Sequence, residues 1–180
     1  TGGEVTTVKM QDKDGHLLET IKGLDLAATD VYDNFHIYGV SALTFTFNAS
    51  FDALKGSKKN DILDGGAGDD HIAGGNGSDQ IVGGTGNDVL TGGGGHDNFY
   101  FRDGSQRDTI TDFNVAGNRR LHDTIEFSTS VFADWNDVLA ATANTDAGAV
   151  ITLDGNNSIT VAGVTKQSLI DHHESDFVFV

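Results

Sequence analysis

Hydrophobic residues recur at every ninth position through the middle of the chain. From Gly65 to Tyr100 the sequence reads GGAGDDHIA GGNGSDQIV GGTGNDVLT GGGGHDNFY, and a degenerate copy, GSKKNDILD, precedes it in the same register. The apolar eighth positions are Leu63, Ile72, Ile81, Leu90 and Phe99. A single nonapeptide places only one apolar residue inward, so one repeat cannot form a hydrophobic core alone. The pattern therefore predicts short strands around the eighth position that stack, with two nonapeptides in each coil.

The segment before the repeats has shorter periods. The runs EVTTVKM and HLLETIKGL flank the polar stretch QDKDG and predict a hairpin. The stretch LDLAATDVYDNFHI has helical spacing, with Asp25 near its start, whereas ALTFTFN alternates Leu43, Phe45 and Phe47 on one face, as a strand does. We expect a small mixed unit here.

The segment after the repeats predicts a second mixed unit. It begins with two related pieces, RDTITDF and HDTIEF, that are spaced more widely than nine residues. STSVFADWNDVLAATAN predicts a helix introduced by Ser and Thr, and AVITLDGNNSITVAGV predicts a hairpin that turns at Asp154-Gly155-Asn156-Asn157. SDFVFV predicts a final strand.

The composition adds a strong acidic charge. The 180 residues include 24 Gly, no Pro, no Cys, and 27 Asp and Glu against 11 Lys and Arg, for a net charge of -16. This charge repels phosphates, which argues against nucleic acids and anionic membrane surfaces and favours cations as partners. The absence of cysteine excludes disulfides and thiolate ligands, and leaves oxygen or imidazole as metal ligands.

The sequence contains neither a membrane-spanning run nor a cleaved signal peptide at its start. No apolar run approaches the roughly 20 residues of a membrane-spanning helix. The start, TGGEVTTVKMQDKDG, has neither the basic head nor the apolar core of a cleaved signal peptide. We expect the chain to begin inside a longer protein.

The sixth position of every repeat is Asp, and this points to a hard cation. The five residues are Asp61, Asp70, Asp79, Asp88 and Asp97. In stacked coils, Asp residues on the same side face each other about 4.8 Å apart, so their charges repel unless a divalent ion lies between them. Glycines let the backbone turn its carbonyls toward such an ion. Calcium suits this mixture because it accepts about 6 to 8 oxygen ligands with loose geometry, whereas zinc and magnesium are more demanding.

With these residues the repeat resembles the calcium-binding nonapeptides of RTX (hemolysin-type) proteins, whose pattern is GGxGxDxUx. The resemblance extends to DNFYFRDGSQRDTITDF, which is similar to the end of the roll in secreted RTX proteins, and to the C-terminal stretch. It implies a mostly all-β fold: a right-handed parallel β-roll solenoid with small mixed α/β caps at both ends. The implied division is an N-terminal cap over 1–54, the roll over 55–112 and a C-terminal cap over 113–180.

The resemblance also implies the ligands. In the family, two repeats separated by one share each ion, through the carbonyls of positions two and four and the Asp of the lower repeat, and those of positions one and three and the Asp of the upper repeat. One site would use Gly66, Gly68 and Asp70 with Gly83, Thr85 and Asp88. A second would use Gly75, Gly77 and Asp79 with Gly92, Gly94 and Asp97. A third, with Ser57, Lys59 and Asp61 facing Gly74, Asn76 and Asp79, departs from the pattern because two glycines are missing. A fourth could pair Gly84, Gly86 and Asp88 with Asp103 or Asp108. About three or four Ca²⁺ ions are expected.

The implied function is a module of a larger exported bacterial protein that folds on meeting extracellular Ca²⁺. An unfolded chain passes a narrow type I secretion channel, and the uncleaved C-terminal signal in this family often ends in an acidic residue followed by apolar ones, as Asp176–Val180 do. The same residues also fit a last strand that caps the roll. The alternative is a calcium-dependent binding module for extracellular polysaccharide or a cell surface, attached to a polysaccharide-modifying enzyme or an adhesin.

A catalytic function finds little support in the motifs. HExxH and GxSxG are absent, and DHHESDF has the wrong order for a zinc protease. We expect His71 and His96 to be solvated surface residues, His122–Asp123 to belong to an irregular late repeat, and His172, His173 and Glu174 to form a polar loop rather than a weak metal site. Trp135 could stack on a sugar, but its spacing with Phe132, Val138 and Leu139 favours core packing. Any catalytic domain would lie upstream.

Overall fold

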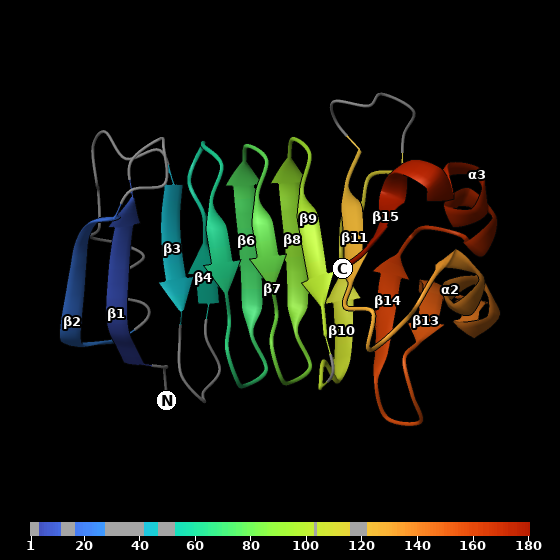
Figure 1. Ribbon diagram of the computed structural model, residues 1–180, viewed down its shortest axis with the longest axis horizontal. Coiled ribbons are helices and arrows are strands. Elements are labelled where there is room, and N and C mark those ends of the chain that lie inside the picture. Colours follow the sequence, from blue (N-terminus) through green and yellow to red (C-terminus); the bar gives the residue numbers. More distant parts are fainter. Residues whose placement is uncertain (1–3, 12–16, 28–41, 47–52, 103, 116–121) are drawn as a thin grey trace.

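Two sheets built mainly of parallel strands face each other along the molecule (Figure 1). The computed structural model describes residues 4–11, 17–27, 42–46, 53–102, 104–115 and 122–180, and it describes side chains from residue 53 onward. One sheet has eight strands in the order β15-β11-β9-β7-β5-β3-β1-β2, and the other has seven in the order β12-β13-β14-β10-β8-β6-β4. Successive strands of the chain alternate between the two sheets through the repeat. The fold is an all-β solenoid.

The repeat forms the middle of both sheets. Its strands are β4 (Ala53–Lys55), β5 (Ile62–Asp64), β6 (His71–Asn76), β7 (Gln80–Val82), β8 (Val89–Gly94) and β9 (Asn98–Phe101). Ile72 pairs with Leu90, and Leu63 pairs with Ile81, in parallel register. Partners are eighteen residues apart, which confirms the prediction of two nonapeptides in each coil.

The eighth positions form the core between the sheets. Leu63, Ile81, Leu90 and Phe99 are 0% exposed and Ile72 is 2% exposed, as the sequence predicts. Ile110 and Ile125 continue the two rows beyond the repeats and are also fully buried. Burial of each such side chain is worth about 1.5–3 kcal/mol, so the stack gains stability with each added coil.

The N-terminal strands extend the eight-stranded sheet. β1 (Glu4–Gln11) pairs antiparallel with β2 (Leu17–Ala27) and with β3 (Ala42–Thr46), and β3 pairs parallel with β5. The predicted hairpin and the strand in ALTFTFN are confirmed. The prediction of a helix starting at residue 24 is wrong for residues 24–27. Leu26 pairs with Val5, and Asp25 lies in the same strand, β2. The rest of that predicted helix, and Phe47, lie outside the described residues.

The C-terminal elements close the other end, on the right of Figure 1. They are β10 (Arg107–Ile110), β11 (Thr124–Phe127), α2 (Trp135–Ala141), β12 (Thr142–Thr145), β13 (Gly148–Thr152), β14 (Ser158–Ala162), α3 (Lys166–Asp176) and β15 (Phe177–Phe179). β10 joins β8 to β14 and β11 joins β9 to β15, all in parallel. The predicted final strand is therefore the last strand of the eight-stranded sheet.

The hairpin predicted over 149–164 is confirmed. β13 and β14 pair antiparallel, and the Asp154 carboxylate accepts hydrogen bonds from the backbone amides of Asn156 and Asn157 at 2.8 and 3.0 Å. A short acidic side chain that bonds its own turn is the usual device for such a loop.

Both helices differ from the expectation. The predicted helix over 128–144 is shortened to α2: Asp134, rather than Ser or Thr, is its N-cap, and residues from Thr142 onward pair with β13 instead. The polar loop expected at His172–Glu174 is wrong, since these residues lie in α3, which Thr165 caps. Leu169 and Asp176 are the buried residues of α3, so an apolar period that would predict a helix is absent from its sequence.

Aromatic side chains pack where the helices meet the sheet. Phe127 contacts Phe132 edge to face at 5.0 Å between ring centroids and lies 6.3 Å from the rings of both Phe177 and Phe179. Trp135 is half-buried against Phe177, which confirms the prediction that it packs in the core. Both sheets run without a break through the predicted limits at 54–55 and 112–113, so those domain bounds stay a prediction.

Candidate metal centre

The sixth-position Asp residues form two ladders, one along each edge of the solenoid. On one edge, the backbone amide of Asp61 donates to Oδ1 of Asp79 at 2.8 Å, and the amide of Asp79 donates to Oδ1 of Asp97 at 2.9 Å. On the other edge, the amide of Asp70 donates to Oδ1 of Asp88 at 2.8 Å. All five side chains are at most 2% exposed. Each coil thus fixes the carboxylate of the coil above it.

The second carboxylate oxygen has a different environment. Among the described residues, Oδ2 of Asp79, Asp88 and Asp97 is buried and has no hydrogen-bond partner. A buried carboxylate oxygen without a donor is costly, so such an oxygen marks a place where a cation would bind. In the degenerate first repeat, Oδ2 of Asp61 instead accepts a hydrogen bond from the backbone amide of Ser57 at 2.5 Å.

A glycine lies against the Oδ2 atom of the Asp in each complete repeat, and at two of these turns a carbonyl oxygen of the next coil lies there too. A Cβ added to Gly65 would meet Oδ2 of Asp70 and would lie 2.6 Å from the carbonyl oxygen of Gly83. At the next turn, a Cβ on Gly74 would meet Oδ2 of Asp79 and would lie 2.6 Å from the carbonyl oxygen of Gly92. The missing side chain therefore leaves a space lined by one carboxylate oxygen and one carbonyl oxygen from different coils.

The second and fourth glycines are required for another reason. Gly84 has φ +106°, and a Cβ there would fall on the carbonyl oxygen of Gly66 in the neighbouring coil. The same conformation recurs in the second and fourth positions of all four complete repeats: Gly66, Gly68, Gly75, Gly77, Gly84, Gly86, Gly93 and Gly95. Only glycines have positive φ within the described ranges, so Ser57 and Lys59 do not adopt this turn.

Electrostatics agree with the geometry. Burial, together with the charges of Asp97 and Asp61, raises the pKa of Asp79 from 3.8 to about 7. Burial also raises the pKa of Asp88 and of Asp97 above the usual range. These carboxylates bind protons readily because burial disfavours their charged form, and a bound divalent cation would offset the same cost.

The structure brings the residues of the first and second predicted sites together across adjacent coils, and Gly74 and Asp61 of the third site also converge at Gly56. Some predicted carbonyl ligands already accept amides: the Gly66 oxygen accepts from Thr85, that of Thr85 from Gly68, and that of Gly94 from Gly77. A carbonyl oxygen has two lone pairs, so these bonds leave one lone pair each.

A sixth repeat, hidden in the sequence, follows the fifth. Residues 103–111 read DGSQRDTIT, and Thr109 and Ile110 pair with Val89 and Leu90 as seventh and eighth positions. Gly104 has φ +95°, and Oδ1 of Asp108 accepts from the amide of Asp88 at 2.9 Å. Two extra residues, Phe101 and Arg102, shift the period and conceal it. Asp103 lies outside the described residues.

Asp108 and Asp123 end the two ladders. Asp108 is 1% exposed, its Oδ2 has no hydrogen-bond partner among the described residues, and burial raises its pKa to about 7. Asp123 accepts the amide of Asp97 at 3.0 Å, and burial raises its pKa to about 6. The sequence predicts Asp108 as a ligand but does not predict Asp123 as one. The tripeptide DTI, shared by RDTIT and HDTIE, is the sequence signal that relates Asp123 to Asp108.

The histidines do not form a second metal centre. In the part of the chain that the structure describes, no group of three or more His, Cys, Asp or Glu side chains is arranged to hold a metal ion. His71 is exposed, as expected, but His96 is half-buried against the His122 ring, with centroids 4.8 Å apart. The stack brings these two rings together because His96 and His122 precede paired positions, Asp97 and Asp123, of neighbouring coils.

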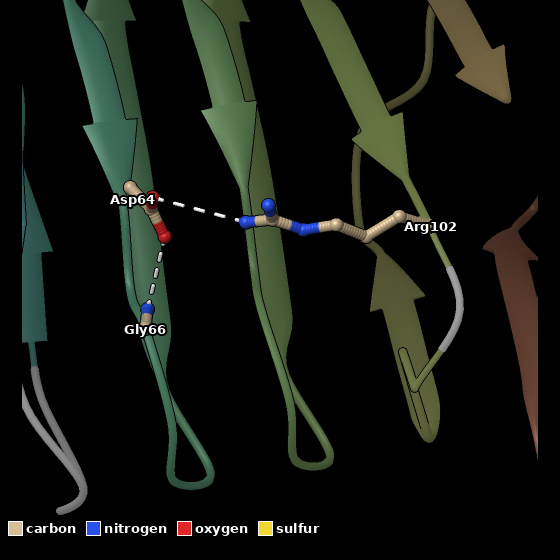
Figure 2. A network of polar contacts seen from close by, with 3 residues as sticks. All are labelled: Asp64, Gly66 and Arg102. Carbon is tan, nitrogen blue, oxygen red and sulfur yellow. Dashed lines mark hydrogen bonds and ion pairs between the residues drawn. The ribbon is translucent and has the colours of Figure 1, made fainter. Parts of the chain in front are cut away.

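An ion pair between Arg102 and Asp64 lies on the outward face of the eight-stranded sheet. Figure 2 shows Arg102 reaching from the end of β9 across β7 to Asp64 at the end of β5, where the charged atoms are 3.9 Å apart. Oδ1 of Asp64 also accepts the amide of Gly66 at 3.1 Å. Both side chains are partly exposed, so this pair adds little stability.

None of the helices in the described ranges has the length and apolar character needed to cross a membrane.

Comparison with known proteins places the repeat in a family. The family model of the RTX calcium-binding nonapeptide repeat, which holds four copies, matches residues 48–81 and 73–110. The solution structure of the AlgE6R3 subunit from the Azotobacter vinelandii mannuronan C5-epimerase is similar over 73% of this chain and 78% of its own, with a TM-score of 0.53 and 24% identity. At this identity the likeness concerns the fold. No curated protein sequence matches the chain significantly.

Proposed function

The chain carries RTX calcium-binding nonapeptide repeats over residues 48–110, and from this premise we propose that it is a module that folds on binding extracellular Ca²⁺ and so supports the export and stability of a larger protein. The observation that carries the proposal is the set of buried Oδ2 atoms of Asp79, Asp88, Asp97 and Asp108, which have no hydrogen-bond partner among the described residues. Bound calcium supplies the positive charge that these oxygens lack.

The ligands proposed from the repeat pattern fit this arrangement. Two sites have complete sets: Gly66, Gly68 and Asp70 with Gly83, Thr85 and Asp88, and Gly75, Gly77 and Asp79 with Gly92, Gly94 and Asp97. The site of Asp61, Gly74, Asn76 and Asp79 is weaker, because the amide of Ser57 occupies Oδ2 of Asp61. A fourth, with Gly84, Gly86, Asp88 and Asp108, is supported by the ladder bond between the two Asp residues. These sites together would bind three or four Ca²⁺ ions.

Folding is coupled to binding in this proposal. Without cations, the glycine-rich repeats lose much conformational entropy on folding and bring unneutralised carboxylates together, so the chain stays expanded. Extracellular modules bind calcium at roughly 10⁻⁴ to 10⁻³ M, well above cytosolic levels. The chain would thus remain unfolded in the cytosol, pass a type I secretion channel, and fold outside the bacterium.

The C-terminal residues would act first as a secretion signal and then, after folding, as a cap of the solenoid. Asp176 is fully buried and Phe177–Phe179 pair with β11 in the folded state, so they cap the solenoid. In the unfolded chain the same acidic-apolar ending is available to the secretion machinery as an uncleaved signal. A catalytic domain, where the parent protein has one, would lie upstream of these residues.

A second candidate function is binding of extracellular polysaccharide. It is favoured by the partly exposed Arg102 on the outward face of the eight-stranded sheet and by the fold shared with a subunit of an enzyme named for mannuronan. An acidic polymer could be held there by Arg102 together with bound calcium. The parent protein would then be a polysaccharide-modifying enzyme or an adhesin.

A calcium titration followed by far-UV circular dichroism tests the proposal. We expect a cooperative rise of the β signal between about 0.1 and 10 mM Ca²⁺, and no such rise with Mg²⁺ at equal concentration. A chain fully folded in chelator, with unchanged stability when calcium is added, would overturn it. Retention of the calcium-loaded chain on an acidic polysaccharide column, lost in Arg102→Ala, would support the second function.

A further inference from the structure

Asn76 is the one asparagine in the sequence that a glycine follows. It ends strand β6, its side chain is exposed, and Gly77 opens the turn that leads to Asp79. Gly77 has no side chain to hinder the approach of its backbone nitrogen to the side-chain amide before it. In an unfolded chain this pair can therefore react with itself far faster than the other asparagines, each of which precedes a bulkier residue.

The reaction is the loss of ammonia from the Asn76 side chain. The backbone nitrogen of Gly77 releases its proton to solvent and attacks Cγ of Asn76. A bond between that nitrogen and Cγ forms, and the bond between Cγ and Nδ2 breaks as ammonia leaves with a proton from solvent. Water then opens the cyclic imide at either carbonyl. One product has an ordinary aspartate link, and the other has an isoaspartate link, in which the backbone runs through the side-chain carbon.

In the folded roll the attacking nitrogen is held away from this reaction. The N–H of Gly77 donates to the carbonyl oxygen of Gly94 in the next coil at 2.7 Å. Asn76 pairs with Gly94 in the parallel ladder between β6 and β8, which lie side by side (Figure 1). Oδ1 of Asn76 lies 3.2 Å from the position of a Cβ added to Gly94. The side-chain amide is thus directed along the stack toward the neighbouring coil.

The preceding coil closes the space on the other side of the pair. A Cβ added to Gly77 would lie 2.5 Å from the carbonyl carbon of Lys59 and 2.8 Å from the backbone nitrogen of Asn60. The amide of Asn76 donates to the carbonyl oxygen of Ser57 at 3.2 Å. The backbone rotation that ring closure needs would break hydrogen bonds to both neighbouring coils. The reaction therefore requires this coil to open first.

The reaction would also damage the proposed calcium sites. The carbonyl of Asn76 belongs to the weaker proposed site, and that of Gly77 belongs to the proposed site of Asp79 and Asp97. An isoaspartate link inserts one carbon into the backbone between these two carbonyls. The amides and carbonyls beyond it then lose their register with the coils on both sides, including the bond from Gly77 to Gly94. A modified chain should therefore fold poorly on adding calcium.

We propose that Asn76–Gly77 is a self-modification site that calcium-induced folding protects, and that its reaction removes the folding response from chains that stay unfolded. The inference rests on the proposed coupling of folding to calcium and goes beyond it, because it gives the unfolded state a limited lifetime. A ligand that binds only the folded chain lowers the population of the open coil. Saturating calcium should therefore slow the reaction by about tenfold or more.

Two asparagine variants test the site. Asn76→Gln removes it, because the longer side chain would have to close a larger ring, which forms far more slowly. Asn87→Gln is the matched control, since Asn87 is an exposed asparagine in the following turn and precedes Asp88 rather than a glycine. Each chain is held in mildly alkaline buffer with chelator or with saturating calcium. Peptide mapping by mass spectrometry then measures conversion of the amide at position 76.

We expect the parent chain and Asn87→Gln to convert at position 76 about tenfold or more faster in chelator than in calcium. Asn76→Gln should not convert on the same timescale. No conversion of the parent chain in chelator would overturn the site. Equal conversion rates in chelator and in calcium would overturn the protection by folding.

Far-UV circular dichroism after each incubation measures the consequence for folding. Calcium is added in excess, and every chain is compared with its own sample taken before incubation. The calcium-induced β signal should fall as conversion proceeds in the parent chain and in Asn87→Gln, and should persist in Asn76→Gln. A full response from converted chains would overturn the inference and leave the proposed function standing. A fresh parent chain that does not respond to calcium would instead overturn the proposed function, and the protection with it.

Discussion

The backbone amide of Asp79 donates a hydrogen bond to Oδ1 of Asp97 at 2.9 Å, across one full coil. The other oxygen of Asp97, Oδ2, is buried and has no hydrogen-bond partner among the described residues. The protein therefore satisfies one oxygen of the carboxylate and leaves the other for a ligand from outside. This division of each carboxylate explains why Asp, with its short and well-fixed side chain, recurs at the sixth position.

Replacing Asp79 by Asn should weaken calcium-induced folding more than replacing Asp61 by Asn. Asp79 belongs to two proposed sites, whereas Asp61 lies in the degenerate repeat and its Oδ2 already accepts the Ser57 amide. We expect the calcium midpoint in circular dichroism to rise about tenfold for Asp79→Asn and less than about threefold for Asp61→Asn. Equal shifts would contradict shared ligation by Asp79.

Replacing Gly84 by Ala should destabilise the calcium-loaded chain by about 2 kcal/mol or more, because an L-residue at φ +106° is strained and its Cβ meets the Gly66 carbonyl. Gly155→Ala is the control, since no atom lies within 4 Å of an added Cβ there and its φ is not positive. Thermal unfolding at saturating calcium measures both. A Gly84→Ala variant as stable as the control would show that the turn adapts.

Acidification should have opposite effects on the calcium-free fold and on calcium binding. Asp79 and Asp108 have pKa values of about 7 in the folded chain against an ordinary 3.8, so protonation favours folding. That stability is fully present below about pH 4 and is lost as the pH rises through about 7. In chelator, we therefore expect more β signal at pH 5 than at pH 8.

Protons compete with calcium for the same oxygens, so the calcium midpoint should be about tenfold higher at pH 6 than at pH 8. Circular dichroism titrations at the two pH values check both effects. A calcium midpoint independent of pH would mean that these carboxylates are not ligands.

Replacing Phe177 by Ala should detach the end of the solenoid. Phe177 is 7% exposed and packs against Phe127 and Trp135, while Val178, next to it in β15, is 40% exposed. We expect a loss of about 3 kcal/mol for Phe177→Ala and about 0.5 kcal/mol or less for Val178→Ala. Urea unfolding in calcium compares the two. Equal losses would mean that β15 does not cap the roll through its inner face.

The sequence alone predicted the regular part of the molecule well. The strict period fixes which residue of each nonapeptide faces inward, so the burial of Leu63, Ile81 and Phe99 could be foreseen. The same period predicts the eighteen-residue spacing of the Asp ladders, of which the bond from Asp70 to Asp88 is an example. A repeat is predictable because every copy repeats one set of local interactions.

The rest depends on contacts between distant segments. Phe101 and Arg102 interrupt the period before Asp108, so the sequence leaves the choice between Asp103 and Asp108 open, and the ladder bond to Asp88 supports Asp108. Twenty-six residues separate Asp97 from Asp123, so only the three-dimensional stack reveals Asp123 as a member of a ladder. The sequence does not predict helix α3, because few of its residues are buried and no apolar face marks it. The local spacing around Asp25 predicts a helix, but pairing with β1 makes this segment part of strand β2.

Long-wavelength anomalous diffraction from crystals grown in calcium tests the central claim most directly, since it locates each ion against named atoms. The account predicts anomalous peaks between Asp70 and Asp88 and between Asp79 and Asp97, each within about 2.3–2.6 Å of carboxylate and glycine carbonyl oxygens. Peaks found only at exposed carboxylates such as Asp69 or Asp146, with none between successive Asp residues of the buried ladders, would contradict it.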